Sequence, residues 1–218
     1  MRQIALTRGD ALLVVDIQND FLPGGSVAVP EGDHVIAPAD QLIRLYHEHG
    51  FPLFFTRCWH PPGHCSFQER GGPWAPHCIA HTHGAAFPDA LQVPEDAAII
   101  SKATGRDEDA YSGFRGTALA EQLRAHGVQR LAVLGLATDF CVLNTVSDAL
   151  ATGFRVMVVQ DAVRAVDANP GDGERALALM AERGALLVHS RPASLLNEAA
   201  LVDPAGVESQ DKLLDPPE

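Results

Sequence analysis

Short apolar runs recur along the chain, and each is continuous rather than alternating with polar residues. A strand covered on one face alternates apolar and polar positions, so continuous runs of this length predict strands buried on both faces, as in a parallel sheet. The runs are ALLVVDI (11–17), FPLFFTR (51–57), AAIISKA (97–103), RLAVLGL (130–136), FRVMVVQD (154–161) and ALLVHS (185–190).

Amphipathic segments with a helical period lie between these runs, and three of them end at Gly50, Gly127 or Gly153, where a left-handed cap is expected. Strand and helix therefore alternate. This order predicts an α/β fold with a doubly wound, mostly parallel sheet of about six strands and helices on both faces. The helical segments span 33–49, 116–126, 139–152 and 172–183.

The length of 218 residues, with 46% hydrophobic residues, suits one core, so we expect a single domain over 1–203. The polar, proline-containing stretch 204–218 is expected to be a flexible tail. The net charge of -12 argues against nucleic acid and anionic membranes as partners, and the N-terminus lacks the apolar core of a signal peptide. These features favour a cytoplasmic protein, and they are compatible with a homo-oligomer.

Cysteine and histidine concentrate in one irregular stretch, 58–96, which is rich in proline and glycine. A loop this long within a compact domain is usually functional. The four cysteines are expected to be free thiols or metal thiolates, because a chain of this size needs no disulfide. They are Cys58, Cys65, Cys78 and Cys141, and the clustered histidines are His60, His64, His77, His81 and His83.

Three chemically capable residues follow or end predicted strands: Asp16, Lys102 and Cys141. In an open parallel sheet the ligand lies beyond the carboxyl ends of the strands, so these side chains are expected to converge there. A nearby cation and a helix N-terminus lower the pKa of a thiol, and a carboxylate can accept its proton. Taken singly, each residue has an ordinary structural explanation: Asp16 as a turn cap, Lys102 as a surface residue and Cys141 as a packed thiol.

Several motifs give the chain a resemblance to the isochorismatase-like cysteine hydrolases and, among them, to the nicotinamidase family. It extends from about Leu12 to about Val188. The motifs are VVDIQNDFLPGGSVAVP, TRCWHPPGHCSF, WAPHCI, KATGRDEDAYSGF and GLATDFCVLNTVSDALATGFRVMVVQDA.

The resemblance implies Cys141 as nucleophile, Asp16 as general base and Lys102 as the cation that orients and activates them. It also implies a cis peptide at Ala137–Thr138 and an oxyanion hole made by the amides of Ala137 and Cys141.

The resemblance further implies a divalent metal bound by His60, His64 and His77 and by the residue at position 58. This chain has Cys58 where the family has an aspartate. A thiolate ligand would favour zinc or iron over magnesium or manganese. Cys58 could also turn away and leave three histidines. A structural zinc site that includes Cys78, and packed histidines without metal, are the alternatives.

The resemblance also implies that three aromatic residues lie at the substrate. Phe21 and Trp74 would sandwich a flat heteroaromatic ring, and Tyr111 would close the pocket. Ordinary core packing is the alternative.

Together, these inferences predict hydrolysis of nicotinamide to nicotinate and ammonia through a Cys141 thioester, with a small-molecule amide as the partner. The alternatives are an amidase of the same superfamily that acts on a carbamoyl or aliphatic amide, and a non-catalytic metal-binding relative. An isochorismatase is disfavoured, because cleavage of a vinyl ether has no use for the thiol.

Overall fold

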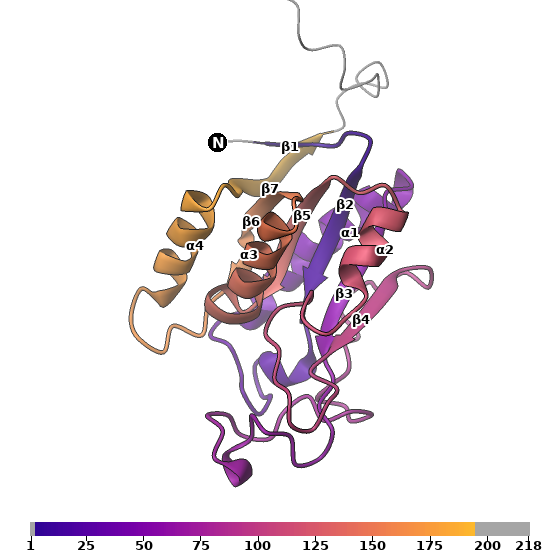
Figure 1. The fold of residues 1–218 in the computed structure, drawn as a ribbon. Coiled ribbons are helices and arrows are strands. Elements are labelled where there is room, and N and C mark those ends of the chain that lie inside the picture. Colours follow the sequence, from indigo (N-terminus) through magenta and orange to yellow (C-terminus); the bar gives the residue numbers. More distant parts are fainter. Residues whose placement is uncertain (1–2, 195–218) are drawn as a thin grey trace, which may run out of the picture.

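The computed structural model describes residues 3–194 and consists of a twisted parallel sheet flanked by helices (Figure 1). The sheet has seven strands in the order β1-β7-β6-β5-β2-β3-β4, and all paired neighbours run parallel. The strands are β1 (Gln3–Ala5), β2 (Asp10–Val15), β3 (Leu53–Cys58), β4 (Ala98–Lys102), β5 (Arg130–Leu136), β6 (Arg155–Arg164) and β7 (Leu186–Ser194).

The six strands predicted from the apolar runs are β2 to β7, so the predicted α/β architecture is confirmed. The seventh, β1, pairs with β7 at one edge. Its three residues are too few to produce a pattern in the sequence. The tail predicted at 204–218 lies outside the described residues, so that expectation stays a prediction.

Successive side chains of a strand point to opposite faces of the sheet, so each apolar run contributes to two layers. Along β2, Leu12 and Val14 pack into the layer that contains α1, whereas Leu13 and Val15 pack into the layer of α2, α3 and α4. Helices therefore cover both faces of the sheet (Figure 1). The helices are α1 (Ile36–Glu48), α2 (Leu119–Ala125), α3 (Leu143–Ala151) and α4 (Asp172–Glu182).

The glycines predicted as helix caps all have positive φ: 69° at Gly50, 68° at Gly127 and 95° at Gly153. Among the described residues, no helix is both long and apolar enough to cross a bilayer. The cytoplasmic location stays a prediction.

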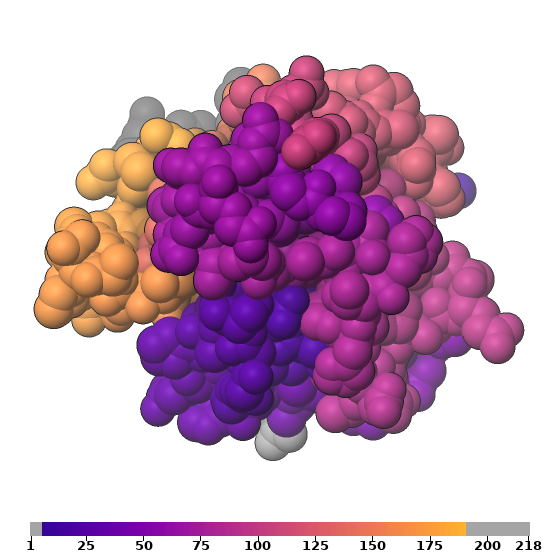
Figure 2. Space-filling view, turned by 90° about the horizontal axis from the view of Figure 1, so that it is seen from below, coloured from indigo at the N-terminus to yellow at the C-terminus, as the bar shows by residue number. Residues whose placement is uncertain are grey.

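The direction of the winding reverses between β2 and β5. From β2 the chain continues outward to β3 and β4, and β6 and β7 lie on the other side of β5. A crevice at such a reversal, beyond the carboxyl ends of the strands, is where open α/β sheets bind ligands. The long segment 59–97 folds over this end of the molecule, where it appears in purple when viewed from below (Figure 2). Two isolated bridges, His60 to Ile79 and Phe67 to Trp74, order that segment.

Candidate active site

The structure brings Asp16, Lys102 and Cys141 together at the reversal point, as predicted. The ammonium nitrogen of Lys102 lies 3.0 Å from Asp16 Oδ2 and 3.5 Å from Cys141 Sγ. All three residues are buried. An ammonium, a carboxylate and a sulfur are therefore within reach of one another and shielded from bulk water.

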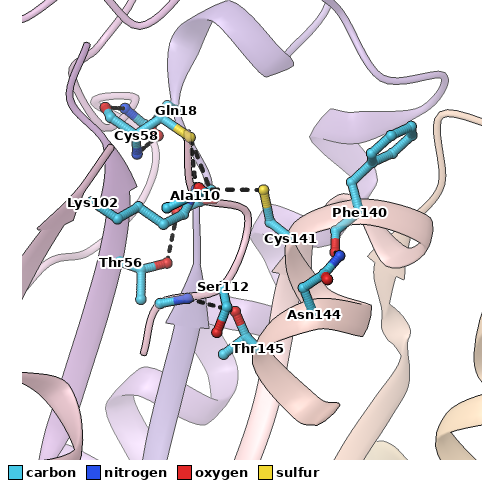
Figure 3. Close-up of polar contacts among 12 residues, drawn as sticks. Gln18, Thr56, Cys58, Lys102, Ala110, Ser112, Phe140, Cys141, Asn144 and Thr145 are labelled. Atoms are coloured by element: carbon cyan, nitrogen blue, oxygen red, sulfur yellow. Dashed lines mark hydrogen bonds and ion pairs between the residues drawn. The ribbon is translucent and has the colours of Figure 1, made fainter. Parts of the chain in front are cut away.

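Strand register explains why these groups meet. Asp16 follows β2 with φ of 48°, a left-handed conformation that aspartate tolerates better than most residues. Its carboxylate accepts a hydrogen bond from the Thr56 hydroxyl at 2.6 Å, on the neighbouring strand β3. Lys102 ends β4 and also donates to the Ala110 carbonyl at 3.0 Å. Figure 3 shows the Lys102 side chain extended toward Ala110 and Cys141.

Cys58 is a fourth member of this cluster. It pairs in register with Lys102 at the ends of β3 and β4, and the Lys102 ammonium donates to its sulfur at 2.9 Å. The sulfur lies 3.7 Å from Asp16 Oδ2. The reactive atoms of Asp16, Cys58 and Cys141 all lie within 4.8 Å of one another. The thiol in place of the expected carboxylate is thus directed at the catalytic candidates (Figure 3).

Burial and charge act in opposite directions on the ion pair. Burial raises the pKa of Asp16 to about 6, although the Lys102 ammonium and the Thr56 hydrogen bond oppose this rise. Burial alone would lower the pKa of Lys102, but Asp16 and the two sulfurs outweigh it and hold that pKa well above its ordinary value. At neutral pH the pair is therefore a carboxylate and an ammonium.

The two thiols differ in acidity. Hydrogen bonds with Cys141 and Cys78, together with the Lys102 ammonium, hold the pKa of Cys58 well below its usual range. The pKa of the Cys141 thiol is raised well above its usual value by the hydrogen bond with Cys58 and by burial. Cys141 therefore carries a proton at rest, beside a carboxylate that can take it.

Cys141 lies in one π-helical turn, Thr138–Val142, which leads from β5 into α3. The cis peptide lies between Leu136 and Ala137, not between Ala137 and Thr138. The predicted position was therefore wrong by one residue, since the resemblance identifies the segment but not the bond within it. Ala137 and Cys141 both line the adjoining pocket, and their role as an oxyanion hole stays a prediction.

A largely apolar pocket of about 500 Å³, including its mouth, opens above Cys141. Its wall contains all three predicted aromatic residues, Phe21, Trp74 and Tyr111. The remaining lining residues are Val27, Val29, Cys58, His60, Ser66, His77, Asp109, Ala110, Ala137, Phe140, Cys141 and Val166.

The aromatic wall is held by specific contacts. Trp74 donates its indole N–H to the Tyr111 hydroxyl at 2.9 Å, and its ring packs edge-on against Phe140 with centroids 5.1 Å apart. Phe21 packs against His77 at 5.7 Å. The sandwich of a substrate ring between Phe21 and Trp74 stays a prediction.

His60 and His77 have the hydrogen bonds expected of metal ligands. Each donates Nδ1–H to a backbone carbonyl, His60 to His77 at 3.1 Å and His77 to Ala75 at 2.8 Å. A ligating histidine usually anchors one ring nitrogen in this way and binds the ion with the other. The two rings are perpendicular, with centroids 4.7 Å apart. Their donor chemistry fits a divalent metal.

His64 fits a metal site less well. Its Nε2 donates to the Glu108 carbonyl at 3.0 Å, and its Nδ1 is 2.8 Å from the Ser66 hydroxyl. Its ring is stacked on His60 within 5° of parallel. Because a metal binds in the plane of an imidazole, these parallel rings cannot share an ion unless one turns. Ligand atoms of His60, His64 and Asp109 nevertheless lie within 4.8 Å of one another.

Three residues of the site were not singled out from the sequence. Gln18 donates to the carbonyls of Cys58 and Ala85 and accepts from the Cys58 amide, which fixes the end of β3. Phe140 could have been found as the neighbour of Cys141, and Asp109 lies within the DAYSGF motif. Gln18 gave no signal beyond its proximity to Asp16.

Comparison with known proteins agrees with this geometry. Residues 10–191 match the isochorismatase domain family. A nicotinamidase of Escherichia coli is 37% identical over 198 residues, which cover 81% of this chain and 93% of that protein. The crystal structure of a pyrazinamidase of Pyrococcus horikoshii in complex with zinc superposes with a TM-score of 0.80 and 50% identity, over 83% of this chain and 99% of that one.

An N-carbamoylsarcosine amidase from Thermoplasma acidophilum is similar at 30% identity and a TM-score of 0.70, over 84% of this chain and 96% of that one. The fold, the buried cluster of Asp16, Lys102 and Cys141, and these matches together define a hydrolase class with a thiol in the turn that follows a central strand. The chain belongs to the isochorismatase family.

Proposed function

We propose that this protein is a cysteine amidohydrolase that converts nicotinamide to nicotinate and ammonia. The observation that carries the proposal is the buried contact among Asp16, Lys102 and Cys141 at the floor of an aromatic-walled pocket. The similarity to nicotinamidases over most of the chain supports the choice of substrate.

In the first half-reaction, Asp16 accepts the Cys141 proton and the sulfur attacks the carboxamide carbon. The resulting oxyanion lies at the turn that follows β5, where the amides of Ala137 and Cys141 donate to it. Asp16 returns its proton to the amide nitrogen, and ammonia leaves. Lys102 keeps Asp16 anionic before the transfer and holds the sulfur in place.

In the second half-reaction, water enters the position vacated by ammonia and attacks the thioester carbonyl. Asp16 accepts a proton from that water, and the same amides hold the second oxyanion. Breaking the C–S bond releases the acid product, which ionises to nicotinate, and Asp16 returns its proton to the Cys141 sulfur, which restores the thiol. Phe21, Trp74 and Tyr111 orient the flat ring by stacking and exclude water from its faces.

A divalent metal, with zinc as the first candidate, fits the wall that holds His60 and His77. We favour Asp109 as its carboxylate ligand, because its oxygen lies close to ring nitrogens of His60 and His64, whereas the sulfur at position 58 is engaged by Lys102. Cys58 and His64 as ligands stay predictions, and His64 would have to release the Glu108 carbonyl. When bound, such an ion would orient the ring nitrogen of the substrate and polarise its electrons.

Replacing the nucleophile tests the proposal most directly. Cys141→Ala should lower ammonia release from nicotinamide by at least about 10³-fold, because the proposed thioester forms on this sulfur. The fold should persist, since a buried thiol and a methyl group differ little in volume. Circular dichroism and thermal unfolding verify this.

The matched control is Cys65→Ala, which removes a half-buried thiol that does not line the pocket. It should retain wild-type turnover. A Cys141→Ala variant that kept a tenth of its activity would exclude covalent catalysis by this sulfur. Turnover of carbamoyl amides without turnover of nicotinamide would instead favour the activity named for the Thermoplasma relative.

A further inference from the structure

Cys58 and Cys141 form a close pair of sulfurs that the hydrolytic mechanism does not require. Each accepts a hydrogen bond from the same ammonium group, Lys102, at 2.9 and 3.5 Å. The two sulfurs lie no more than 4.8 Å apart. A disulfide needs about 2.05 Å between sulfurs, so the cysteine side chains must rotate toward each other for the bond to form.

Both sulfurs face the space that small molecules enter. Cys58 and Cys141 line the pocket, with 4% and 6% of their surface exposed. Cys78 touches Cys58 but is completely buried behind it. A small oxidant that enters the pocket therefore meets Cys58 and Cys141 before Cys78.

We propose that Cys58 and Cys141 are a reversible disulfide site, which hydrogen peroxide closes and thiol reductants open. The proposal rests on the proposed function only in that Cys141 is the nucleophile of that function. Closing the disulfide blocks the nucleophile, and it also protects the sulfur from oxidation that cannot be reversed. The thiol that replaces the family's carboxylate at position 58 makes this chemistry available.

The chemistry takes two steps. One sulfur, as a thiolate stabilised by Lys102, attacks a peroxide oxygen; the O–O bond breaks, and the hydroxide released takes a proton to become water. The second sulfur then attacks the sulfenic acid. Its S–O bond breaks, and the departing oxygen leaves as a second water. The two thiols lose two protons and two electrons in total, and one peroxide is reduced to two waters.

The test is peroxide titration of the purified full-length protein with its native metal content, followed by intact-mass and peptide mass spectrometry. The expected product has lost two hydrogens and yields a cross-linked peptide pair that contains residues 58 and 141. Turnover of nicotinamide should fall by about tenfold or more, and dithiothreitol should restore it.

Two variants sharpen the test. In Cys58→Ser the partner is absent, so peroxide should add two or three oxygens to Cys141, and dithiothreitol should not remove them. In Cys78→Ala, the matched control, the cross-link between residues 58 and 141 should form as in the wild type. This comparison separates the proposed pair from the neighbouring thiol.

Three results would overturn the inference: a cross-link between Cys58 and Cys78, a sulfinic acid on Cys141 of the wild type, or two unmodified thiols at peroxide doses that oxidise glutathione. The cross-link is detected by mass and needs no turnover. Its formation in a protein that does not hydrolyse nicotinamide would refute the proposed function while supporting the disulfide.

Discussion

Asp16 has the environment that a general base needs. Burial raises its pKa, whereas Lys102 and the Thr56 hydroxyl keep the carboxylate available near neutral pH. A base with a pKa of about 6 is stronger than a free aspartate and is still ionised at pH 7. Among these influences on the pKa of Asp16, the hydrogen bond from Thr56 is the one that a substitution can remove without changing a charged residue.

The pH profile tests this assignment. Because protonated Asp16 cannot accept the Cys141 proton, kcat/KM should fall below a midpoint near pH 6. At pH 5 it should be about a tenth of its plateau value. Thr56→Val removes a hydrogen bond that stabilises the carboxylate, so the midpoint should move to higher pH. An unchanged midpoint in this variant, with turnover retained, would show that another group controls the acid limb.

The ends of β3 and β4 explain why the sequence could not predict the role of Cys58. The resemblance placed this residue among the metal ligands, and the histidines nearby supported that view. Its pairing with Lys102 depends on the register between two strands more than forty residues apart in the chain. Strand register is a property of the assembled sheet, so it cannot be deduced from the two segments alone.

At the scale of elements, the close contact between β2 and β5 holds the two halves of the site together. Gly135, with φ of 120°, lies directly against Val15, and an added Cβ would be 2.0 Å from the Val15 carbonyl oxygen. Real Cβ atoms do not approach backbone this closely, so only glycine fits here. The packing immediately before the Cys141 turn depends on this position.

Gly135→Ala should therefore lower the free energy of unfolding by about 3 kcal/mol or more, as measured by urea denaturation. The matched control is Gly127→Ala. That glycine also has positive φ, but nothing lies within 4 Å of the added Cβ. The Gly127→Ala substitution should lower the free energy of unfolding by about 1 kcal/mol. Equal losses in the two variants would show that backbone conformation, and not the contact with Val15, limits the position.

At the scale of the whole molecule, the general layout was predictable and the local details were not. Continuous apolar runs and glycine caps were enough to predict six strands and four helices, because burial of the sheet on both faces leaves a strong hydrophobic pattern in the sequence. Asp16, Lys102 and Cys141 were predictable because each follows or ends a strand. Phe140, Asp109, Gln18 and the position of the cis bond depend on loop geometry, which hydrophobic patterning does not encode.

The proposed metal should stabilise the entire fold, since it joins the 59–97 segment to the residues that precede α2. A ligand that binds only the folded state adds about 2.7 kcal/mol at a hundredfold excess over its Kd. Removing the metal with a chelator should therefore lower Tm, and adding zinc should restore it.

His60→Ala should abolish this dependence and the bound metal itself, as measured by elemental analysis. Asp109→Asn should lower the metal content, whereas Cys58→Ser should leave it nearly unchanged. Metal loss in Cys58→Ser with retention in Asp109→Asn would assign the anionic ligand to the thiolate instead.

The reversal of the winding between β2 and β5 has a mechanical consequence. The proposed base and its lysine come from the half of the sheet that contains β2, β3 and β4, whereas the proposed nucleophile comes from the turn that follows β5 on the other half. β2 and β5 are paired neighbours, so the segments that carry the two groups leave the sheet at adjacent strand ends, which backbone hydrogen bonds hold about 4.8 Å apart. The positions from which the two reacting groups start are therefore set by the sheet, and the 59–97 segment above them supplies part of the pocket wall.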